Sequence, residues 1–191
     1  MSTGLVCILH ADLGMPPWDV FHLGLHHYVP ITYGQVIQGL GLIAILVSYF
    51  LGVKPHIGTF LNMFFIGFFV DVIIFIDIIP YPQHILWRSL QFLGGLFLFA
   101  YGTMGYILLN RGTGPRDSLM VAFSRLTGFR LGIIRTIIEV TVTVVGFALG
   151  GPLGVGTVVF ALGVGPCMEV CTSFINWQNR LFRRMINIKN L

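Results

Sequence analysis

Five apolar runs of about 20 residues each dominate this chain of 191 residues, and no other feature constrains its fold as strongly. They cover approximately 33–53, 57–79, 86–110, 131–151 and 154–175. A helix needs about 20 apolar residues to cross roughly 30 Å of hydrocarbon. Only 9% of the residues are charged, whereas a soluble domain carries about 25%. The sequence therefore predicts an all-α, polytopic membrane helix bundle.

The chain also repeats itself after 98 positions, because the Pro-x-Asp motif at Pro17 recurs at Pro115. Eight glycines lie between positions 14 and 71, and five of them coincide with a glycine 98 positions later. Chance predicts about one or two such coincidences, so we interpret the chain as an internal duplication. The repeated structural motif comprises Gly14, Pro17, Gly58 and Thr59 in the first copy, and Gly112, Pro115, Gly156 and Thr157 in the second.

The duplication predicts two units and a tail, at 1–79, 86–175 and 176–191, within a single membrane domain. Each unit contains three crossings, and an odd number requires the second unit to insert with the opposite orientation. Residues 1–13 align only with the second half of the first helix of unit two, so we expect an N-terminally truncated first helix, the alternative being a first crossing that is only half a helix. The prediction is two inverted-topology repeats of three helices, each with a short amphipathic or re-entrant helix.

Basic residues divide unevenly between the two predicted faces of the membrane. One face carries only Arg88. The other carries Lys54, Arg111, Arg116, Arg125, Arg130, Arg180, Arg183, Arg184 and Lys189. The positive-inside rule makes this second face cytoplasmic. The tail alternates apolar and basic residues, which favours a helix lying on the anionic inner leaflet and a cytoplasmic C-terminus.

The two Pro-x-Asp motifs predict the starts of two short helices. Proline suits the first helical turn, and an aspartate there can accept a free backbone N–H group. One interpretation is a capped helix at the membrane interface. In the other, both short helices dip into the bundle and their N-termini hold an anionic group. The second interpretation makes Trp18, Asp19, Arg116 and Asp117 candidate substrate-binding residues.

Four charged residues lie well inside the predicted membrane segments, away from the segment ends, where charge is costly and usually faces protein or water. Arg135 and Glu139 are one helical turn apart, so they can neutralise each other structurally. They have no polar counterparts in unit one, and this asymmetry makes them candidate substrate-binding residues instead. Asp71 and Glu169 coincide in the two units. They are candidates for carrying protons, or for hydrogen bonding to a neighbouring helix.

Several other kinds of function find little support in the sequence. His22 and His26 have the spacing of metal ligands, but the equivalent positions of unit two carry Met120 and Ser124, so we expect no metal. No nucleophile–base group or phosphate-binding loop is visible, so we expect neither an enzyme nor a bound cofactor. The net charge of +4 is too small and too clustered to indicate nucleic-acid binding.

The stretches LGMPPWDVFHLGL, RGTGPRDSLM, RTIIEV and GGPLGVGTVVFALGVGP resemble the YczE/YyaS/YitT family of bacterial integral membrane proteins, within its YczE-like branch. The resemblance extends over nearly the whole chain. It implies a small multi-pass protein of the bacterial plasma membrane and supplies no biochemical activity. The incomplete first helix departs from the family pattern.

Two functions remain after these exclusions. The first is a secondary transporter or exporter of a small organic molecule, which the predicted inverted repeats favour. The second is a non-transporting accessory or assembly protein that acts through its basic cytoplasmic face. The expected partners are the lipid bilayer and a small-molecule substrate, and a homodimer is left open. A polar cavity reached by both short helices would favour transport, and a dry, close-packed bundle would favour the accessory role.

Overall fold

The computed structural model describes residues 1–108 and 114–189, with side chains described as far as Gln178. The described residues form helices and connecting turns only. In chain order the helices are α1 (Ser2–Ala11), α2 (Pro17–His26), α3 (Tyr33–Phe50), α4 (Ile57–Ile76), α5 (Ile85–Ile107), α6 (Pro115–Thr127), α7 (Leu131–Ala148) and α8 (Val155–Lys189). Five of them, α3, α4, α5, α7 and the first part of α8, are long and apolar enough to cross a membrane. The protein is therefore an all-helical, multi-pass membrane bundle.

The helix boundaries repeat with the same offset as the sequence. Three helices of the second half begin 98 positions after a counterpart, in the pairs α2 and α6, α3 and α7, and α4 and α8. Helices α3 and α7 also end 98 positions apart. Each is followed by a glycine with positive φ, 87° at Gly52 and 86° at Gly150. This backbone conformation is accessible to glycine at little cost and reverses the chain after the helix.

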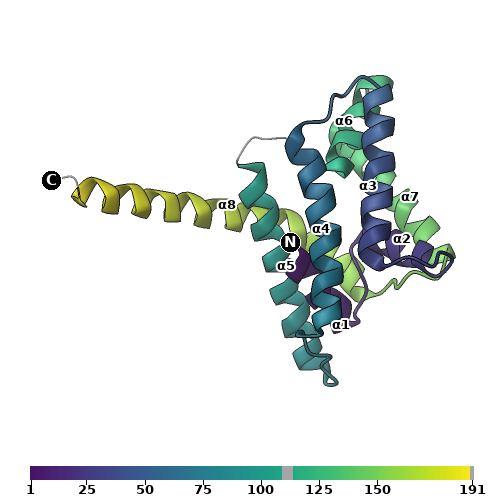
Figure 1. Cartoon of the computed structure of the whole chain (residues 1–191), viewed down its shortest axis with the longest axis horizontal. Helices are drawn as coiled ribbons and strands as arrows, with labels where there is room; N and C mark the ends of the chain where they lie inside the picture. Colours follow the sequence, from purple (N-terminus) through teal and green to yellow (C-terminus); the bar gives the residue numbers. More distant parts are fainter. Residues whose placement is uncertain (109–113, 190–191) are drawn as a thin grey trace.

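Short helix α1 lies in the middle of the bundle and packs against α4 and α5 (Figure 1). Leu5, Val6 and Ile8 are among the least exposed side chains of the described residues. At Gly4 the backbones of α1 and α5 come so close that an added Cβ would lie 2.5 Å from the Gly95 carbonyl oxygen. Small residues permit this kind of close helix packing in a membrane.

Each short helix packs on the third helix of the other half of the chain. Helix α2 crosses α7 where an added Cβ on Gly24 would lie 2.5 Å from the Gly146 carbonyl oxygen. Helix α6 packs on α3, where the corresponding residues are the fully buried Ala122 and Ser48. Both crossings therefore carry small residues at equivalent positions, and the two halves are interlocked through α2 and α6.

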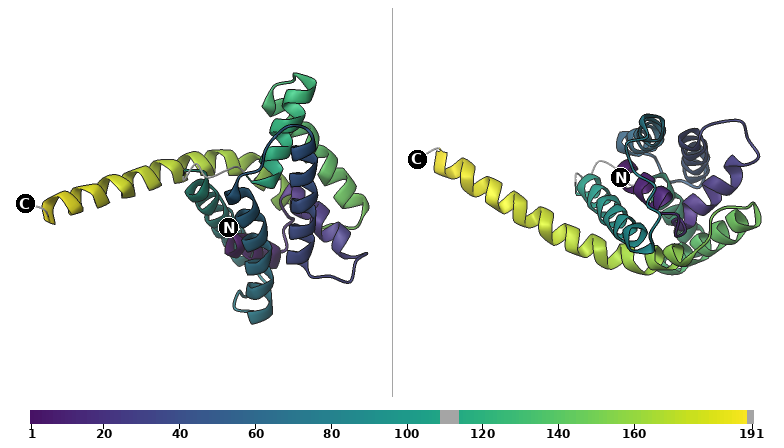
Figure 2. Two further views of the ribbon diagram at one scale, coloured as in Figure 1. Left: turned by 45° about the horizontal axis from the view of Figure 1, so that its top comes forward. Right: turned by 90° about the horizontal axis from the view of Figure 1, so that it is seen from below.

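The two halves differ in how their last two helices pack. Helices α3 and α4 meet at Gly34 and Gly67, where an added Cβ on either glycine would overlap the carbonyl oxygen of the other. The equivalent glycines of α7 and α8, Gly132 and Gly165, have no atom within 4 Å of an added Cβ. Helix α8 instead packs on α5. It runs crosswise to α3 and α4, and its C-terminal half extends beyond the bundle (Figures 1 and 2).

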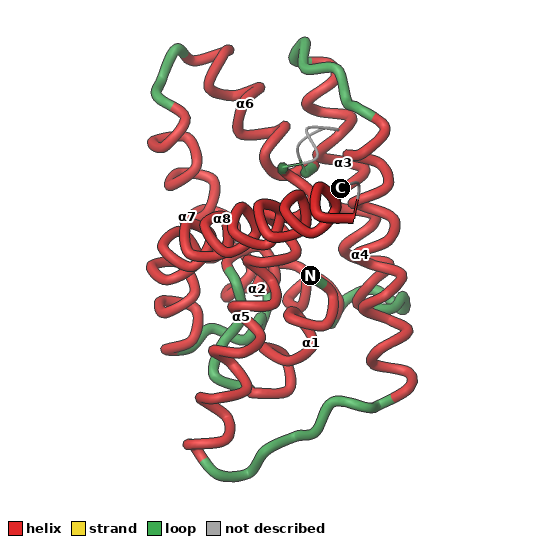
Figure 3. The backbone as a smooth tube through the Cα atoms, turned by 90° about the vertical axis from the view of Figure 1, so that its left-hand side faces the viewer, coloured by secondary structure: helices red, strands yellow, loops and turns green. Residues whose placement is uncertain are grey.

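The first part of α8, Val155–Gln178, coincides with the expected fifth crossing, and the helix extends into the range 176–191 that was expected to form a tail. The helix continues from Val155 to Lys189 without a break, with Pro166 in its interior. Figure 3 shows the α3–α4 loop and the α6–α7 turn at one end of the bundle, and the α4–α5 loop at the opposite end. The loops carrying Lys54 and His84 thus lie on opposite ends, as expected from the sequence.

Residues of the repeated motif connect the segment that follows α1 to the start of α8. Gly14 has φ 112°, and an added Cβ would lie 2.7 Å from the Gly154 backbone nitrogen. The backbone N–H of Gly156 donates to the Leu13 carbonyl at 2.7 Å, and the Thr157 hydroxyl accepts from the Gly154 N–H. In the other copy, Thr59 is buried at the start of α4 and Gly58 is partly buried. Gly112 lies outside the described residues.

Candidate functional site

A cavity of about 370 Å³ lies between the two halves of the chain. Helices α1, α3 and α4 line it from the first half, and α5, α6, α7 and α8 from the second. The N-terminal residues of both short helices also border it, Pro17 and Trp18 from α2 and Pro115 and Arg116 from α6. Pockets of this size and mixed lining are typical of small-molecule sites.

Proline opens both short helices, but the residue before it gives the two aspartates different partners. In α6 the preceding residue is Gly114, whose backbone N–H donates to the Tyr106 hydroxyl at 2.9 Å and also favours the ionised Asp117 carboxylate. In α2 the preceding residue is Pro16, which has no N–H group to donate. The Asp19 carboxylate therefore has no cap to make at this position. It is directed instead to side chains of its own and neighbouring helices.

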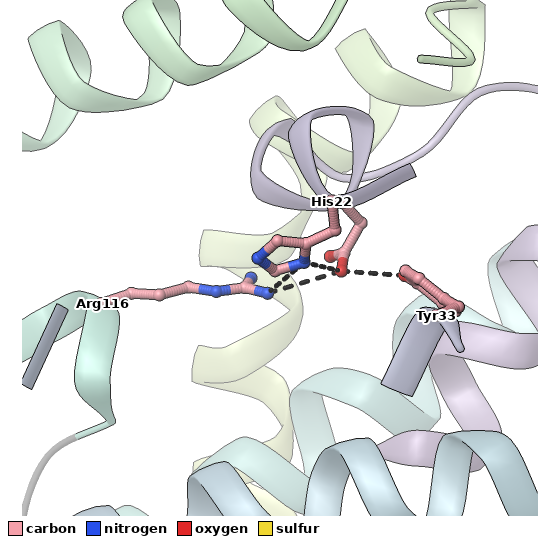
Figure 4. Close-up of polar contacts among 4 residues, drawn as sticks. His22, Tyr33 and Arg116 are labelled. Carbon is pink, nitrogen blue, oxygen red and sulfur yellow. Dashed lines mark hydrogen bonds and ion pairs between the residues drawn. The ribbon is translucent and has the colours of Figure 1, made fainter. Parts of the chain in front are cut away.

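Asp19 is fully buried, and its side chain forms a polar cluster with three partners, His22, Tyr33 and Arg116, which Figure 4 labels. Its Oδ1 accepts a hydrogen bond from the Tyr33 hydroxyl at 2.9 Å and one from His22 Nδ1 at 3.0 Å. The same oxygen lies 3.4 Å from a terminal nitrogen of Arg116, which comes from α6. When Nδ1 of His22 carries the proton that it donates to Asp19, it cannot also accept from Arg116. The ion pair joins residues 97 positions apart, so it links the two halves of the chain.

Burial and neighbouring charge act in opposite directions on these groups. Burial alone raises the pKa of Asp19, but the Arg116 charge and the hydrogen bonds from His22 and Tyr33 outweigh it and lower the pKa to about 2. Burial lowers the pKa of His22, with the Arg116 charge acting in the same direction and Asp19 opposing it. Near neutral pH the cluster therefore contains an ionised Asp19, a neutral His22 and the Arg116 cation.

Arg116 also contacts Trp18, the residue that occupies the equivalent place in α2. The guanidinium carbon lies 5.4 Å from the centre of the Trp18 ring, within the range of a cation–π interaction. Trp18 is only 8% exposed, and its indole N–H is buried without an acceptor among the described residues. Asp19 Oδ2 is likewise buried and has no hydrogen-bond partner among them. The sequence placed Arg116 on the basic cytoplasmic face, but its side chain turns inward to this cluster.

Arg135 and Glu139 line the same cavity from α7. Arg135 Nε donates to Glu139 Oε1 at 2.9 Å, so the pair is formed as its spacing predicts. The side chain of Arg135 is 51% exposed and that of Glu139 is 26% exposed. Asp117 lies near both arginines; burial raises its pKa, and the charges of Arg135 and Arg116 oppose that change. Five of the six predicted substrate-binding residues thus line one cavity, and the sixth, Asp19, lies directly behind it.

The two residues considered for proton transfer lie elsewhere. Asp71 accepts hydrogen bonds from the Gly34 backbone N–H at 2.7 Å and from the Thr32 hydroxyl, so it caps the start of α3. Glu169 is exposed on α8 and does not line the cavity. The position of Asp71 fits the alternative interpretation, in which this residue forms a hydrogen bond to a neighbouring helix. A proton-carrying role for either residue remains a prediction.

His22 and Tyr33 belong to the site, although sequence reasoning did not select them for it. The i,i+4 spacing of His22 and His26 suggested metal ligands. The i,i+3 spacing of Asp19 and His22 is the pattern that predicts the observed side-chain hydrogen bond. Tyr33 gives no local signal, because it reaches Asp19 only through the packing of α3 on α2. Among the described residues, no group of three or more potential metal ligands comes together.

Comparison with known proteins places the chain in a family. A model described as "Family of unknown function (DUF6198)" matches residues 1–173. The chain belongs to the DUF6198 family. The Bacillus subtilis uncharacterized membrane protein YczE is similar to this DUF6198 member, with 37% identity over 155 residues, 80% of this chain and 71% of that protein. An uncharacterized Haemophilus influenzae protein is 30% identical over 175 residues, covering 92% of this chain and 78% of its own length.

A second Bacillus subtilis protein, the uncharacterized YyaS, is 24% identical to this DUF6198 member over 159 residues, which cover 82% of this chain and 79% of YyaS. These matches confirm the resemblance to YczE and YyaS that the motifs predicted. No solved structure matches the chain. The names of these relatives assign no activity.

Proposed function

We propose that this protein is a secondary carrier of a small organic molecule and that the cavity between the two halves is its substrate site. The observation that carries the proposal is the meeting of both proline-headed short helices at one cavity that also contains Arg135 and Glu139. Helix N-termini at a cavity between repeats are a recurring design of secondary transporters. Membrane-buried charges usually mark such pathways.

The repeated architecture supports the same proposal. In this account the two halves are inverted repeats, and α2 and α6 each pack on the third helix of the other half. A carrier needs two similar halves that can move against each other around a fixed site. A non-transporting accessory protein needs no cavity between its halves, and nothing in such a role would place paired charges there.

A binding test uses a variant that fills the cavity. Val121 lines the cavity from α6, so Val121→Trp should occupy part of the space in which a ligand binds. Leu126→Trp is the matched control, because Leu126 lies on the same helix, is 64% exposed and does not line the cavity. The full chain, purified in a mild detergent, is screened for small molecules that raise its melting temperature.

The proposal expects compounds that stabilise the wild type and Leu126→Trp but have little effect on Val121→Trp. Stabilisation by a ligand follows from binding to the folded state alone, and about 100-fold excess over Kd contributes about 2.7 kcal/mol. If every stabilising compound acts equally on all three proteins, the cavity is not a ligand site and the proposal fails.

A further inference from the structure

Two polar atoms beside the cavity have unused hydrogen-bonding capacity among the described residues. They are the indole N–H of Trp18 and Oδ2 of Asp19. Trp18 is 8% exposed and Asp19 is 0% exposed, so neither side chain is freely solvated. Buried polar groups are almost always paired, and an exception in a native structure calls for an explanation. Trp18 lines the cavity, but its indole N–H is itself covered, so a ligand accepts its hydrogen bond once the ring turns toward the cavity.

Arg116 is held loosely enough to serve such a ligand. Its distance of 3.4 Å from Asp19 Oδ1 is longer than the 2.7–2.9 Å that is typical, roughly, of a strong charge-assisted hydrogen bond. The side chain is 28% exposed and borders the cavity. A guanidinium has five N–H donors in a planar fork that matches the oxygens of a carboxylate, phosphate or sulfonate. Arg116 and the Trp18 N–H together form a donor set for an anionic group.

The remainder of the cavity is suited to an apolar body. Leu5, Ile37, Phe99, Phe160 and Val164 contribute to its lining from four helices. The second arginine, Arg135, already donates to Glu139, so its charge is balanced within α7. Arg116 has a longer ion pair than Arg135, so we expect the anionic group of a ligand to bind Arg116. The apolar part of the ligand then contacts the apolar side chains that line the rest of the cavity.

We infer, as a refinement that rests on the carrier function proposed above, that the substrate is an organic acid with an apolar body. Its anionic group binds Arg116 and the Trp18 N–H, and the Asp19–His22 pair takes up one proton as Arg116 turns to the ligand. The site thus binds an acid anion together with a proton.

The proton balance follows from the cluster. Before binding, Arg116 neutralises the ionised Asp19. When the ligand anion pairs with Arg116, Asp19 is left fully buried beside a neutral His22, which is costly for a carboxylate. One proton from solvent then forms an O–H bond on Asp19 or an N–H bond on His22, and the pair shares it. One anion and one proton enter, so the net charge of the site does not change.

No other described group compensates Asp19 when Arg116 turns away. Helix α3 contributes Tyr33, which donates one hydrogen bond to Oδ1. Helix α7, which packs on α2, brings Arg135 and Glu139, and these pair with each other. On α6, Asp117 is itself a carboxylate and supplies no positive charge to Asp19. Proton uptake is therefore the remaining way to neutralise the buried carboxylate.

The test uses naphthalene-2-sulfonate as the probe, because a sulfonate stays anionic at every pH used and cannot carry the proton itself. Naphthalene-2-sulfonamide is its neutral counterpart. Isothermal titration calorimetry of the full chain in lipid nanodiscs, repeated in two buffers of different ionisation enthalpy, measures affinity and protons taken up. We expect close to one proton per sulfonate, and an affinity that falls by up to about tenfold per pH unit as the pH rises between about 6 and 8.

Two variants assign these effects to the cluster. Asp19→Asn should bind the sulfonate without proton uptake and with no pH dependence. The double variant Arg116→Gln, Asp19→Asn removes the ion pair without leaving a lone charge, and should lose at least about tenfold in sulfonate affinity. Arg125→Gln, an exposed arginine on the same helix, should behave like the wild type.

The outcomes separate this inference from the proposed function. The ligand class is wrong if the sulfonate does not bind, or binds as tightly to the double variant as to the wild type. The coupling is wrong if it binds without proton uptake. If only the sulfonamide binds, and Val121→Trp blocks it, the carrier proposal stands and the acid does not. If ligands bind in the cavity but the cavity can be reached from only one side of the membrane, the carrier proposal alone is refuted.

Discussion

Replacing Gly34 by alanine should destabilise the protein and replacing Gly132 should not, although these glycines occupy the same position in the two halves. An added Cβ on Gly34 would overlap the Gly67 carbonyl oxygen and lie 2.6 Å from the Asp71 carboxylate. The Gly34 backbone N–H also donates to Asp71 at 2.7 Å. At Gly132 the same atom would meet nothing within 4 Å.

The expected magnitudes follow from these surroundings. Overpacking a close contact costs about 1–3 kcal/mol, and disturbing a hydrogen bond to a charged group costs about 1.5–3 kcal/mol. Alanine recovers at most about 1 kcal/mol through its higher helix propensity. Gly34→Ala should therefore lower the free energy of unfolding by about 2–4 kcal/mol, and Gly132→Ala should leave it unchanged or raise it by up to about 1 kcal/mol.

The measurement is reversible unfolding of both purified variants by SDS in the same mild detergent, followed by far-UV circular dichroism. Each alanine variant serves as the control for the other, because the substitution and helix position are the same. Equal destabilisation of the two variants would show that α7 and α8 pack as closely as α3 and α4. An unaffected Gly34→Ala would show that the close approach in the first half is absent. Either result would refute the packing argument.

Three further predictions concern the fold and the charged pair. Gly156→Leu should destabilise the protein by at least about 2 kcal/mol in the same assay, because an added Cβ would lie 2.7 Å from the Phe92 ring; unchanged stability would contradict this contact. Single cysteines introduced at position 84 should react with an impermeant reagent in intact cells, whereas those at position 54 should react only after lysis; the same labelling for both would contradict the topology. The double variant Arg135→Leu, Glu139→Leu should fold but bind cavity ligands more weakly, because both side chains line the cavity, and Glu139→Leu alone should be less stable, since it leaves Arg135 unpaired; normal ligand binding by the folded double variant would make the pair structural.

Much of the fold could be predicted because the signals are local or periodic. Long apolar runs identify the spanning helices, and Pro17 and Pro115 mark where the two short helices begin. The offset of 98 positions could be carried from sequence to helix boundaries, since a duplication preserves the residues that start and end helices. The course of α8 could not be predicted in this way. The glycines of α4 recur in α8, but tertiary packing decides whether they form a close helix–helix contact, as Gly67 does and Gly165 does not.

The candidate site could be predicted in part, because some of its residues give a local sequence signal. Arg135 and Glu139 stand out because membrane charge is costly, and their i,i+4 spacing predicts the observed ion pair. The Asp19 cluster depends on contacts between α2, α3 and α6, which are distant in sequence. Position 16 carries proline, which has no N–H group, where the second half has Gly114, and Asp19 forms its hydrogen bonds with Tyr33 and His22. That consequence becomes clear only when the neighbouring helices are in place.

The most direct test of the carrier account is whether the cavity opens to each side of the membrane in turn. In a variant that lacks the three native cysteines, single cysteines replace Ala44 or Val121, which line the cavity from opposite halves. Cysteines at Lys54 and His84, at opposite ends of the bundle, report one-sided access as controls. The account predicts that an impermeant thiol reagent labels both cavity positions in intact cells and also in inverted vesicles, and that a cavity ligand slows the labelling. Labelling of the cavity from one side only, or from neither, would contradict it.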